Sequence, residues 1–266
     1  MCQRESKLFF RRQNIELKTA KEIEKMRVAG KVVGEILEKL SEIIKPGITT
    51  KDIDVFSEKY IRSLKMLPAF FGVQGMKYPF PSSACVSVND EVVHGIPNAS
   101  RVLKSGDIVS VDMGVLYEGY YGDAAKTYAV GSIATSAAKL LRVTEQSLQK
   151  GIEQALPGNR LGDISCAVQE TAENGGFSVV RDFVGHGIGR SLHEDPQIPN
   201  YGKADTGVKL LPGMVLAIEP MVNAGGYEVY MLDDDWTVVT RDGSLSAHFE
   251  HTVAITEDGY EILTKV

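Results

Sequence analysis

An internal repeat constrains the fold of this 266-residue chain more than any other feature of its sequence. Each half opens with two apolar runs at helical spacing, and a Pro-Gly pair breaks the first run from the second. Pro46-Gly47 precedes Asp52-Ile53 in the first half. In the second half, Pro157-Gly158 precedes Asp163-Ile164 by the same interval. The repeat predicts two related halves, each a helix pair followed by strands.

The predicted helices have clear starts and inward faces. Thr19 can cap the first helix with Glu22 reaching back, and Thr49 can cap the second. The first two helices have the inward residues Ile23, Met26, Val33, Ile36, Leu37, Leu40 and Ile44, then Ile53, Phe56, Ile61 and Leu64. The next helix begins at Thr135 or Ser136, and the second pair has the inward residues Leu140, Leu141, Leu148 and Ile152, then Ile164, Ala167, Val168 and Thr171.

Strands fill the rest of each half. They are predicted at 84–93, 107–114, 120–130, 178–183, 215–222, 236–241 and 248–256. Most are joined by short turns that contain glycine, which predicts a largely antiparallel sheet with helices packed on one side, an α+β arrangement. We expect a flexible basic tail over residues 1–14 and one domain over 15–266, with repeat halves of about 15–133 and 134–266.

Two acids in the first half suggest a shared site. Asp112 follows Ile-Val-Ser-Val, and Asp123 follows Tyr-Tyr-Gly on the next strand. If Glu118-Gly119 forms the turn, Asp123 lies opposite Gly114 and Asp112 opposite Ala125, so the two carboxylates are diagonal neighbours on one face. Buried like charges this close repel each other unless a cation lies between them.

The second half delivers two further strand-borne acids, Glu219 and Glu250. For each acid alone, a salt bridge or a place at an exposed strand end is the simpler interpretation. Lys126 and Arg241 are too few to neutralise all four acids, so the set predicts a cation site. The glycine-flanked His186 adds a nitrogen ligand, and such oxygen-rich sets suit two ions such as Mn, Fe, Co or Zn.

The two histidines that flank Glu250 are not predicted to be metal ligands. His248 and His251 are predicted to point away from the face that carries Glu250 and to serve as support or surface.

Composition and charge argue against several classes of protein. With 43% apolar and 24% charged residues the chain is globular, and a net charge of −6 argues against nucleic-acid specificity. The cysteines, Cys2, Cys85 and Cys166, fit neither a disulfide framework nor a zinc site, which favours a reducing compartment. No apolar stretch approaches a membrane span and no signal peptide is recognisable, so a cytoplasmic protein without membrane contact is expected.

Six motifs together resemble type I methionine aminopeptidases of the bacterial kind, in order and from about Ile15 to Val266. They are Cys85-Val-Ser-Val-Asn-Asp-Glu-Val-Val-His94-Gly-Ile-Pro, Val111-Asp112-Met-Gly, Tyr121-Gly-Asp123-Ala-Ala-Lys-Thr, Gly185-His186-Gly-Ile-Gly-Arg-Ser-Leu-His193-Glu-Asp-Pro, Ile218-Glu219-Pro and Phe249-Glu250-His-Thr. The resemblance implies the pita-bread fold, two pseudo-symmetric αβ halves around a dinuclear metal site. It also implies hydrolytic removal of the N-terminal methionine from nascent proteins and peptides, with a small second residue preferred.

The resemblance also implies residue roles. The five metal ligands would be Asp112, Asp123, His186, Glu219 and Glu250. The family mechanism is attack by a metal-bridging hydroxide, with Glu219 as proton shuttle, His193 donating to the oxyanion and His94 holding the peptide.

The resemblance assigns the methionine pocket and one further ion. The pocket would comprise Tyr78, Phe80, Cys85, Leu192 and Trp236, an apolar slot with soft partners for sulfur, although each alone would read as core. Asn89 and Ser246 match a monovalent-cation site. The segment 71–81 is not a clean match to the family's pocket loop, and Leu192 stands where many relatives have Phe.

Other interpretations remain open from the residues alone. An X-Pro peptidase shares fold and ligands, and a di-metal hydrolase of another acyl substrate fits the bare chemistry. A non-enzymatic binding module would typically have lost ligands that are all present here. A monomer is expected, with transient ribosome contact through the basic tail as a further expectation.

Overall fold

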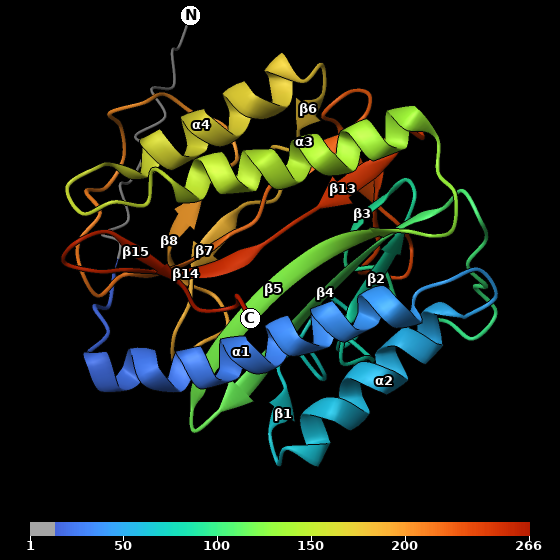
Figure 1. Ribbon diagram of the computed structural model, residues 1–266, viewed down its shortest axis with the longest axis horizontal. Coiled ribbons are helices and arrows are strands. Elements are labelled where there is room, and N and C mark those ends of the chain that lie inside the picture. The colour runs from blue at the N-terminus through green and yellow to red at the C-terminus, as the bar shows by residue number, and fades with distance from the viewer. Residues whose placement is uncertain (1–13) are drawn as a thin grey trace, which may run out of the picture.

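The computed structural model describes residues 14–266. The tail predicted over residues 1–14 therefore lies outside the described residues except for Asn14, whose backbone N–H donates to the Asp195 carboxylate. The helices are α1 (Ala20–Ile43), α2 (Thr50–Ser63), α3 (Thr135–Ile152) and α4 (Leu161–Asn174). Each half opens with one helix pair, and Figure 1 shows α1 beside α2 and α3 beside α4.

Strands follow each helix pair. After α2 come β1 (Leu67–Pro68), β2 (Cys85–Val88), β3 (Glu91–Val93), β4 (Ile108–Tyr117) and β5 (Tyr120–Ala129). After α4 come β6 (Ser178–Val179), β7 (Gly185–Gly187), β8 (Glu194–Ile198), β9 (Val215–Ile218), β10 (Met221–Asn223), β11 (Val229–Met231), β12 (Val238–Thr240), β13 (Ser246–His248), β14 (His251–Ile255) and β15 (Tyr260–Ile262).

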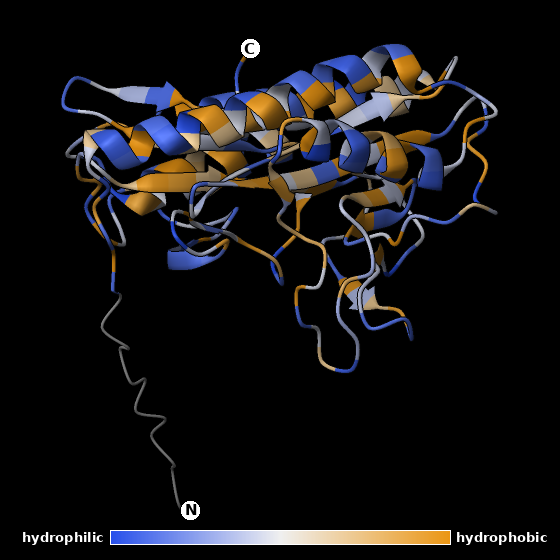
Figure 2. Cartoon of the chain, turned by 90° about the horizontal axis from the view of Figure 1, so that it is seen from below, coloured by the Kyte–Doolittle hydropathy of each residue, from blue (hydrophilic) through white to orange (hydrophobic). Residues whose placement is uncertain are grey.

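All strand pairs within residues 14–266 are antiparallel, as predicted. The two larger sheets have the orders β1-β4-β2, with β5 on β4, and β15-β14-β9-β7-β8. Figure 2 shows the helices as a layer on one side of the strands and long loops on the other. The α+β prediction with helices on one side is therefore confirmed.

Local sequence explains the helix starts. The Thr49 hydroxyl accepts from Asp52 N, and the Asp52 carboxylate accepts from Thr49 N, which makes the capping box that begins α2. The Thr19 backbone N–H donates to Glu22 in the same way at α1. The prediction for Leu64 is wrong: it caps the C-terminus of α2 and is 44% exposed, because the inward stripe ends one turn earlier at Ile61.

Several predicted strands are shorter than expected. The 84–93 strand is divided by a turn at Asn89-Asp90, where Asn89 adopts a left-handed conformation. The 215–222 strand is divided at Pro220, which lacks the N–H that would continue a ladder. The 248–256 strand is divided at Phe249-Glu250. Two of these breaks leave an acidic residue, Glu219 or Glu250, just outside a regular strand.

The two cores lie between the helices and the strands. In the first half, Ile36 and Leu40 of α1 pack with Val111 of β4, and in the second half Leu148 of α3 packs with Leu216 of β9. Helix α1 approaches β5 closely, since a Cβ on Gly122 would lie 2.5 Å from the Gly30 nitrogen. Only glycine fits at position 122, directly before Asp123. No helix within residues 14–266 is both long enough and apolar enough to cross a bilayer.

Candidate metal centre

The β4–β5 hairpin brings the first two acids together. Glu118-Gly119 forms the turn, Asp112 pairs with Ala125, and Asp123 pairs with Gly114. This is the register that the sequence predicts. Asp123 is 3% exposed, and one oxygen of each carboxylate is buried without a hydrogen-bond partner among residues 14–266. The two acids therefore lie as diagonal neighbours on one buried face.

The second half supplies its acids from adjacent strands. Glu219 follows the last residue of β9, whose Ile218 pairs with His251 on β14. Glu250 immediately precedes β14, and its backbone N–H donates to the carbonyl of Ala125 at 2.9 Å. Because Ala125 pairs with Asp112, this hydrogen bond helps to join the two halves at the site, as do the bonds between Asp123 and Thr252.

His186 completes the cluster. It lies on β7, opposite Ala217 of β9. Its Nδ1 lies 2.9 Å from the Gly187 carbonyl oxygen, which can only accept, so Nδ1 carries the proton and Nε2 presents a lone pair. That Nε2 is 3.5 Å from Glu219 Oε1. In this orientation His186 is prepared to act as a ligand.

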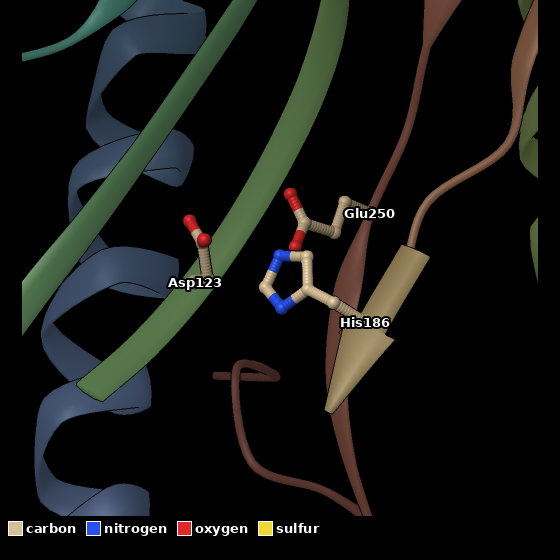
Figure 3. Close-up of side chains that lie close together, drawn as sticks. All are labelled: Asp123, His186 and Glu250. Carbon is tan, nitrogen blue, oxygen red and sulfur yellow. The ribbon is translucent and has the colours of Figure 1, made fainter. Parts of the chain in front are cut away.

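Three of the predicted ligands already form a metal-sized group. One ligand atom from each of Asp123, His186 and Glu250 lies within 4.8 Å of the others. Figure 3 shows the His186 ring beside the Glu250 carboxylate, with Asp123 facing them from β5. Asp112 and Glu219 line the same cavity. The structure therefore gathers all five predicted ligand side chains at one place.

The buried, mutually repelling carboxylates of the cluster favour binding of a cation. Burial, followed by repulsion from the neighbouring acids, raises the pKa of Asp112, Glu219 and Glu250 well above the usual range. Burial lowers the pKa of His186 to about 3, so the imidazole is neutral. Unsatisfied carboxylate oxygens beside a neutral ring form a donor set that fits divalent ions with oxygen and nitrogen ligands.

The prediction for His248 is wrong. Its side chain is 1% exposed, and Nε2 lies 3.6 Å from Glu219 Oε2 at the edge of the cluster. Positions 248 and 250 are two residues apart, and the two-residue period of a strand, which places such positions on one face, was the signal that could have shown it. His251 does point away, and its Nδ1 lies 2.8 Å from the Thr264 hydroxyl.

A cavity of about 70 Å³ adjoins the acids. Besides the five acid and imidazole groups it is lined by His94 and His193 and by an apolar set, namely Phe70, Val73, Phe80, Cys85, Leu192 and Trp236. The ring of His193 meets His186 edge-on with centroids 4.5 Å apart, and His94 meets Trp236 edge-on at 6.0 Å. Both predicted substrate histidines therefore face the cavity.

The predicted methionine pocket needs one correction. Tyr78 is 63% exposed and lies outside the cavity, because it belongs to a loop that projects from the surface. The sequence interpretation missed Phe70 and Val73, which line the cavity from the two ends of a short loop segment. No periodic pattern marks that segment, so no sequence signal identified them.

Asn89 and Ser246 lie side by side, as a shared ion would require. The Ser246 backbone N–H donates to the Asn89 carbonyl at 2.8 Å, and the Ser246 hydroxyl donates to Asn223. The Asn89 side chain is engaged with Asp107 and with the backbone of Ile108. A monovalent cation at this place stays a prediction.

A cavity that joins buried carboxylates and a neutral imidazole to an apolar slot defines a metal-dependent enzyme. Comparisons with known proteins agree. The chain matches metallopeptidase family M24 over residues 24–257. A methionine aminopeptidase of Clostridium acetobutylicum is 55% identical over 250 residues, which cover 94% of this chain and 98% of that protein. Methionine aminopeptidase 1 of Bacillus subtilis is 56% identical over 249 residues, covering 94% and 98%.

Solved structures support the same placement. The crystal structure of methionine aminopeptidase from Thermotoga maritima has a TM-score of 0.91 and 53% identity, covering 95% of this chain and all of that one (100%). The prolidase of Pyrococcus furiosus has a TM-score of 0.73 at 23% identity, which shows the shared fold alone. The chain belongs to metallopeptidase family M24 and, within it, to the methionine aminopeptidases. Its fold is the pita-bread fold of that family.

Proposed function

We propose that this protein removes the N-terminal methionine from polypeptides and peptides, with a preference for a small second residue. The observation that carries the proposal is the cavity itself. Its one end holds Asp123, His186 and Glu250, and its other end is an apolar slot that contains the Cys85 thiol and the Trp236 indole. Aromatic and sulfur groups are favourable partners for a thioether. The names of the similar proteins support the same substrate.

Two divalent ions, drawn from Co, Mn, Fe and Zn, would be held by Asp112, Asp123, His186, Glu219 and Glu250. Bound there, the ions would supply Lewis acidity and an activated water for hydrolysis. The unsatisfied buried oxygens of Asp112, Asp123 and Glu250 support this ligand set. Which ion serves in the cell depends on availability as much as on affinity.

The protein's own groups would handle protons and orientation. Glu219 would shuttle a proton, since both of its oxygens lie near imidazole nitrogens, one of His186 and one of His248. Burial lowers the pKa of His94 to about 4, and partial burial also lowers the pKa of His193. Both rings are therefore neutral at pH 7, which lets His193 donate to the developing oxyanion and His94 hold the peptide.

The substrate pocket would consist of Phe80, Cys85, Leu192 and Trp236, with Phe70 and Val73 added to the predicted set. Phe80 and Trp236 meet edge-on with centroids 5.1 Å apart, which gives the slot a stiff aromatic wall. Tyr78 has no place in this pocket.

The setting of the protein follows the same proposal. Its substrates would be nascent chains that begin with Met, with transient ribosome contact, and it would act as a cytoplasmic monomer without nucleic-acid or membrane partners. Residues 15–266 would form one catalytic domain of two repeat halves. A monovalent cation between Asn89 and Ser246 would stabilise the loop between β2 and β3, where Asn89 adopts a left-handed conformation.

Peptide cleavage separates this proposal from its nearest rival. We expect release of free Met from Met-Ala-Ser and no cleavage of Ala-Pro-Ser when Mn is present. Cleavage of the prolyl peptide alone would move the assignment to an X-Pro peptidase, which shares the fold. A matched peptide, Met-Leu-Ser, tests the preference for a small second residue and should be cleaved more slowly.

A further inference from the structure

Asp235 is a buried acid that the proposed chemistry does not use. It stands in the turn between β11 and β12, is 5% exposed and has a left-handed backbone conformation with φ of 73°. Its Oδ2 accepts two backbone N–H groups, from Lys77 at 2.6 Å and Tyr78 at 3.1 Å. Its Oδ1 is buried without a hydrogen-bond partner among residues 14–266, so these two bonds offset only part of the cost of withdrawing the carboxylate from water. Asp235 thus fixes the backbone of Lys77 and Tyr78.

The two donors belong to a flap, defined as residues 72–80. Gly72 N donates to Phe80 O and Phe80 N to Val73 O, so the flap folds back on itself like a hairpin. Its tip is open to water, since the side chain of Met76 is 80% exposed and that of Tyr78 is 63% exposed. Few apolar contacts hold such a tip, and its position depends on polar tethers.

The tether comes from one short segment. Beside the Asp235 carboxylate, the indole N–H of Trp236 donates to Tyr78 O at 3.1 Å. A Cβ on Gly75 would lie 2.7 Å from the Trp236 ring and 2.9 Å from Asp235 Oδ2. The flap therefore rests directly on Asp235 and Trp236, with no space for a side chain at position 75.

The turn that presents Asp235 is itself braced. Asp234 accepts from the N–H groups of Trp236 and Thr237 and from the Thr237 hydroxyl. The strand that follows, β12, pairs with β3 through Val238 and Val93, and Val93 precedes His94. The turn thus connects the flap to β3, the strand that ends directly before His94.

The flap is a wall of both spaces that a substrate would enter. Val73 and Phe80 line the small cavity that holds the acids. Val73, Gln74, Gly75 and Met76 also line the wider cleft of about 900 Å³ outside it, together with Asp235 itself. Movement of the flap would change the width of the pocket and of the cleft together.

We propose that Asp235 is a positioning residue that latches the flap and thereby sets the selectivity for methionine. The proposal rests on the proposed function, because the selectivity concerns the same pocket. Asp235 touches no reacting group in this account and acts through the backbone of Lys77 and Tyr78.

Two substitutions test the latch without straining the turn. Asp235→Gly removes the carboxylate and tolerates the positive φ, whereas Asp235→Asn keeps an oxygen acceptor. Asp233→Ala, at an exposed position of the same turn, is the matched control. We expect Asp235→Gly to raise KM for Met-Ala-Ser about tenfold with kcat changed less than about twofold. It should also lower the ratio of kcat/KM for Met-Ala-Ser to that for Leu-Ala-Ser. Asp235→Asn should restore most of the KM and most of this ratio.

A second readout does not depend on catalysis. Trypsin should cut after the exposed Lys77 faster in Asp235→Gly than in the wild type, and the amides of Lys77 and Tyr78 should exchange with solvent faster. Unchanged KM, selectivity and Lys77 cleavage in Asp235→Gly would overturn the latch. If the wild type fails to cleave Met-Ala-Ser, the proposed function is wrong, while proteolysis and amide exchange still test the latch separately.

Discussion

Asp112 and Asp123 are diagonal neighbours across the β4–β5 hairpin, because Asp112 pairs with Ala125 and Asp123 pairs with Gly114. Their separation along the chain is set by the Glu118-Gly119 turn, and their environment by the glycine at position 122, which lets α1 cover the strand. Two buried carboxylates in this relation repel each other, and burial and that repulsion raise the pKa of Asp112. The fold therefore holds an arrangement that is costly without a cation.

Removal of one carboxylate should eliminate metal binding and turnover together. Asp112→Asn and Glu250→Gln each withdraw an oxygen ligand from the cluster, so we expect no measurable Mn binding by calorimetry and no Met release. Glu257→Gln, on the exposed turn before β15, is the control and should behave as the wild type. Metal-free Asp112→Asn protein that still releases Met would contradict a metal-dependent mechanism.

Asp112→Asn should stabilise the metal-free protein at alkaline pH. A carboxyl whose folded pKa is raised contributes stability below its unfolded pKa and loses it as pH rises through the folded value. Burial and the neighbouring acids raise the folded pKa of Asp112, so the stability difference between Asp112→Asn and the chelated wild type should shrink as pH falls from 8. Asp112→Asn should raise the free energy of unfolding at pH 8 by about 1–2 kcal/mol, since it removes a buried charge. Thermal unfolding of chelated proteins measures both effects, and an unchanged or lower Tm for Asp112→Asn at pH 8 would refute them.

His193 should affect chemistry more than binding. It faces His186 at the rim of the cavity and would donate to the carbonyl oxygen as charge develops there. His193→Ala is expected to lower kcat about 100-fold with KM changed little. His251→Gln, on the opposite side of the strand beside Thr264, should leave kcat within about twofold of the wild type, as expected for a group remote from the reacting atoms. Equal losses in the two variants would argue against a role for His193 in the transition state.

Glu22 should stabilise the fold only above acidic pH. Hydrogen bonds from the Tyr120 hydroxyl first, and from Thr19, lower its pKa from 4.5 to about 2. A lowered folded pKa contributes stability above the unfolded value, which is lost as pH falls from about 4.5 towards 2. Glu22→Gln should lower Tm at pH 7, and the difference should disappear near pH 2. A difference that persists at pH 2 would show that packing, not charge, is responsible.

Short-range sequence patterns were sufficient to predict much of the fold. The capping boxes at Thr19 and Thr49 and the turn at Glu118-Gly119 are short-range features, so the sequence alone predicts α1, α2 and the Asp112–Asp123 register. Strands β7 and β8 were not predicted, because their residues are glycine-rich or polar and their order comes from the pairing of β7 with β9 and of β8 with β7.

Long-range contacts limited the site prediction. The approach of His248 to Glu219 depends on how β13 and β14, which belong to different sheets, are placed relative to β9. The backbone of Tyr78 is held by a hydrogen bond to Asp235, a residue far away in the sequence. Neither long-range contact has a local sequence signal, although the two-residue period of a strand already places His248 on the same face as Glu250.

The most direct test of the account is release of free methionine by protein whose metal has been removed and then restored. Chelated protein is incubated with Met-Ala-Ser and Leu-Ala-Ser, and Mn or Co is added back to half of each sample. We expect no release of Met before the metal is added, and release from the methionine peptide alone afterwards. Equal release with and without metal, or equal cleavage of both peptides, would contradict the proposed role of the acid cluster or of the apolar slot.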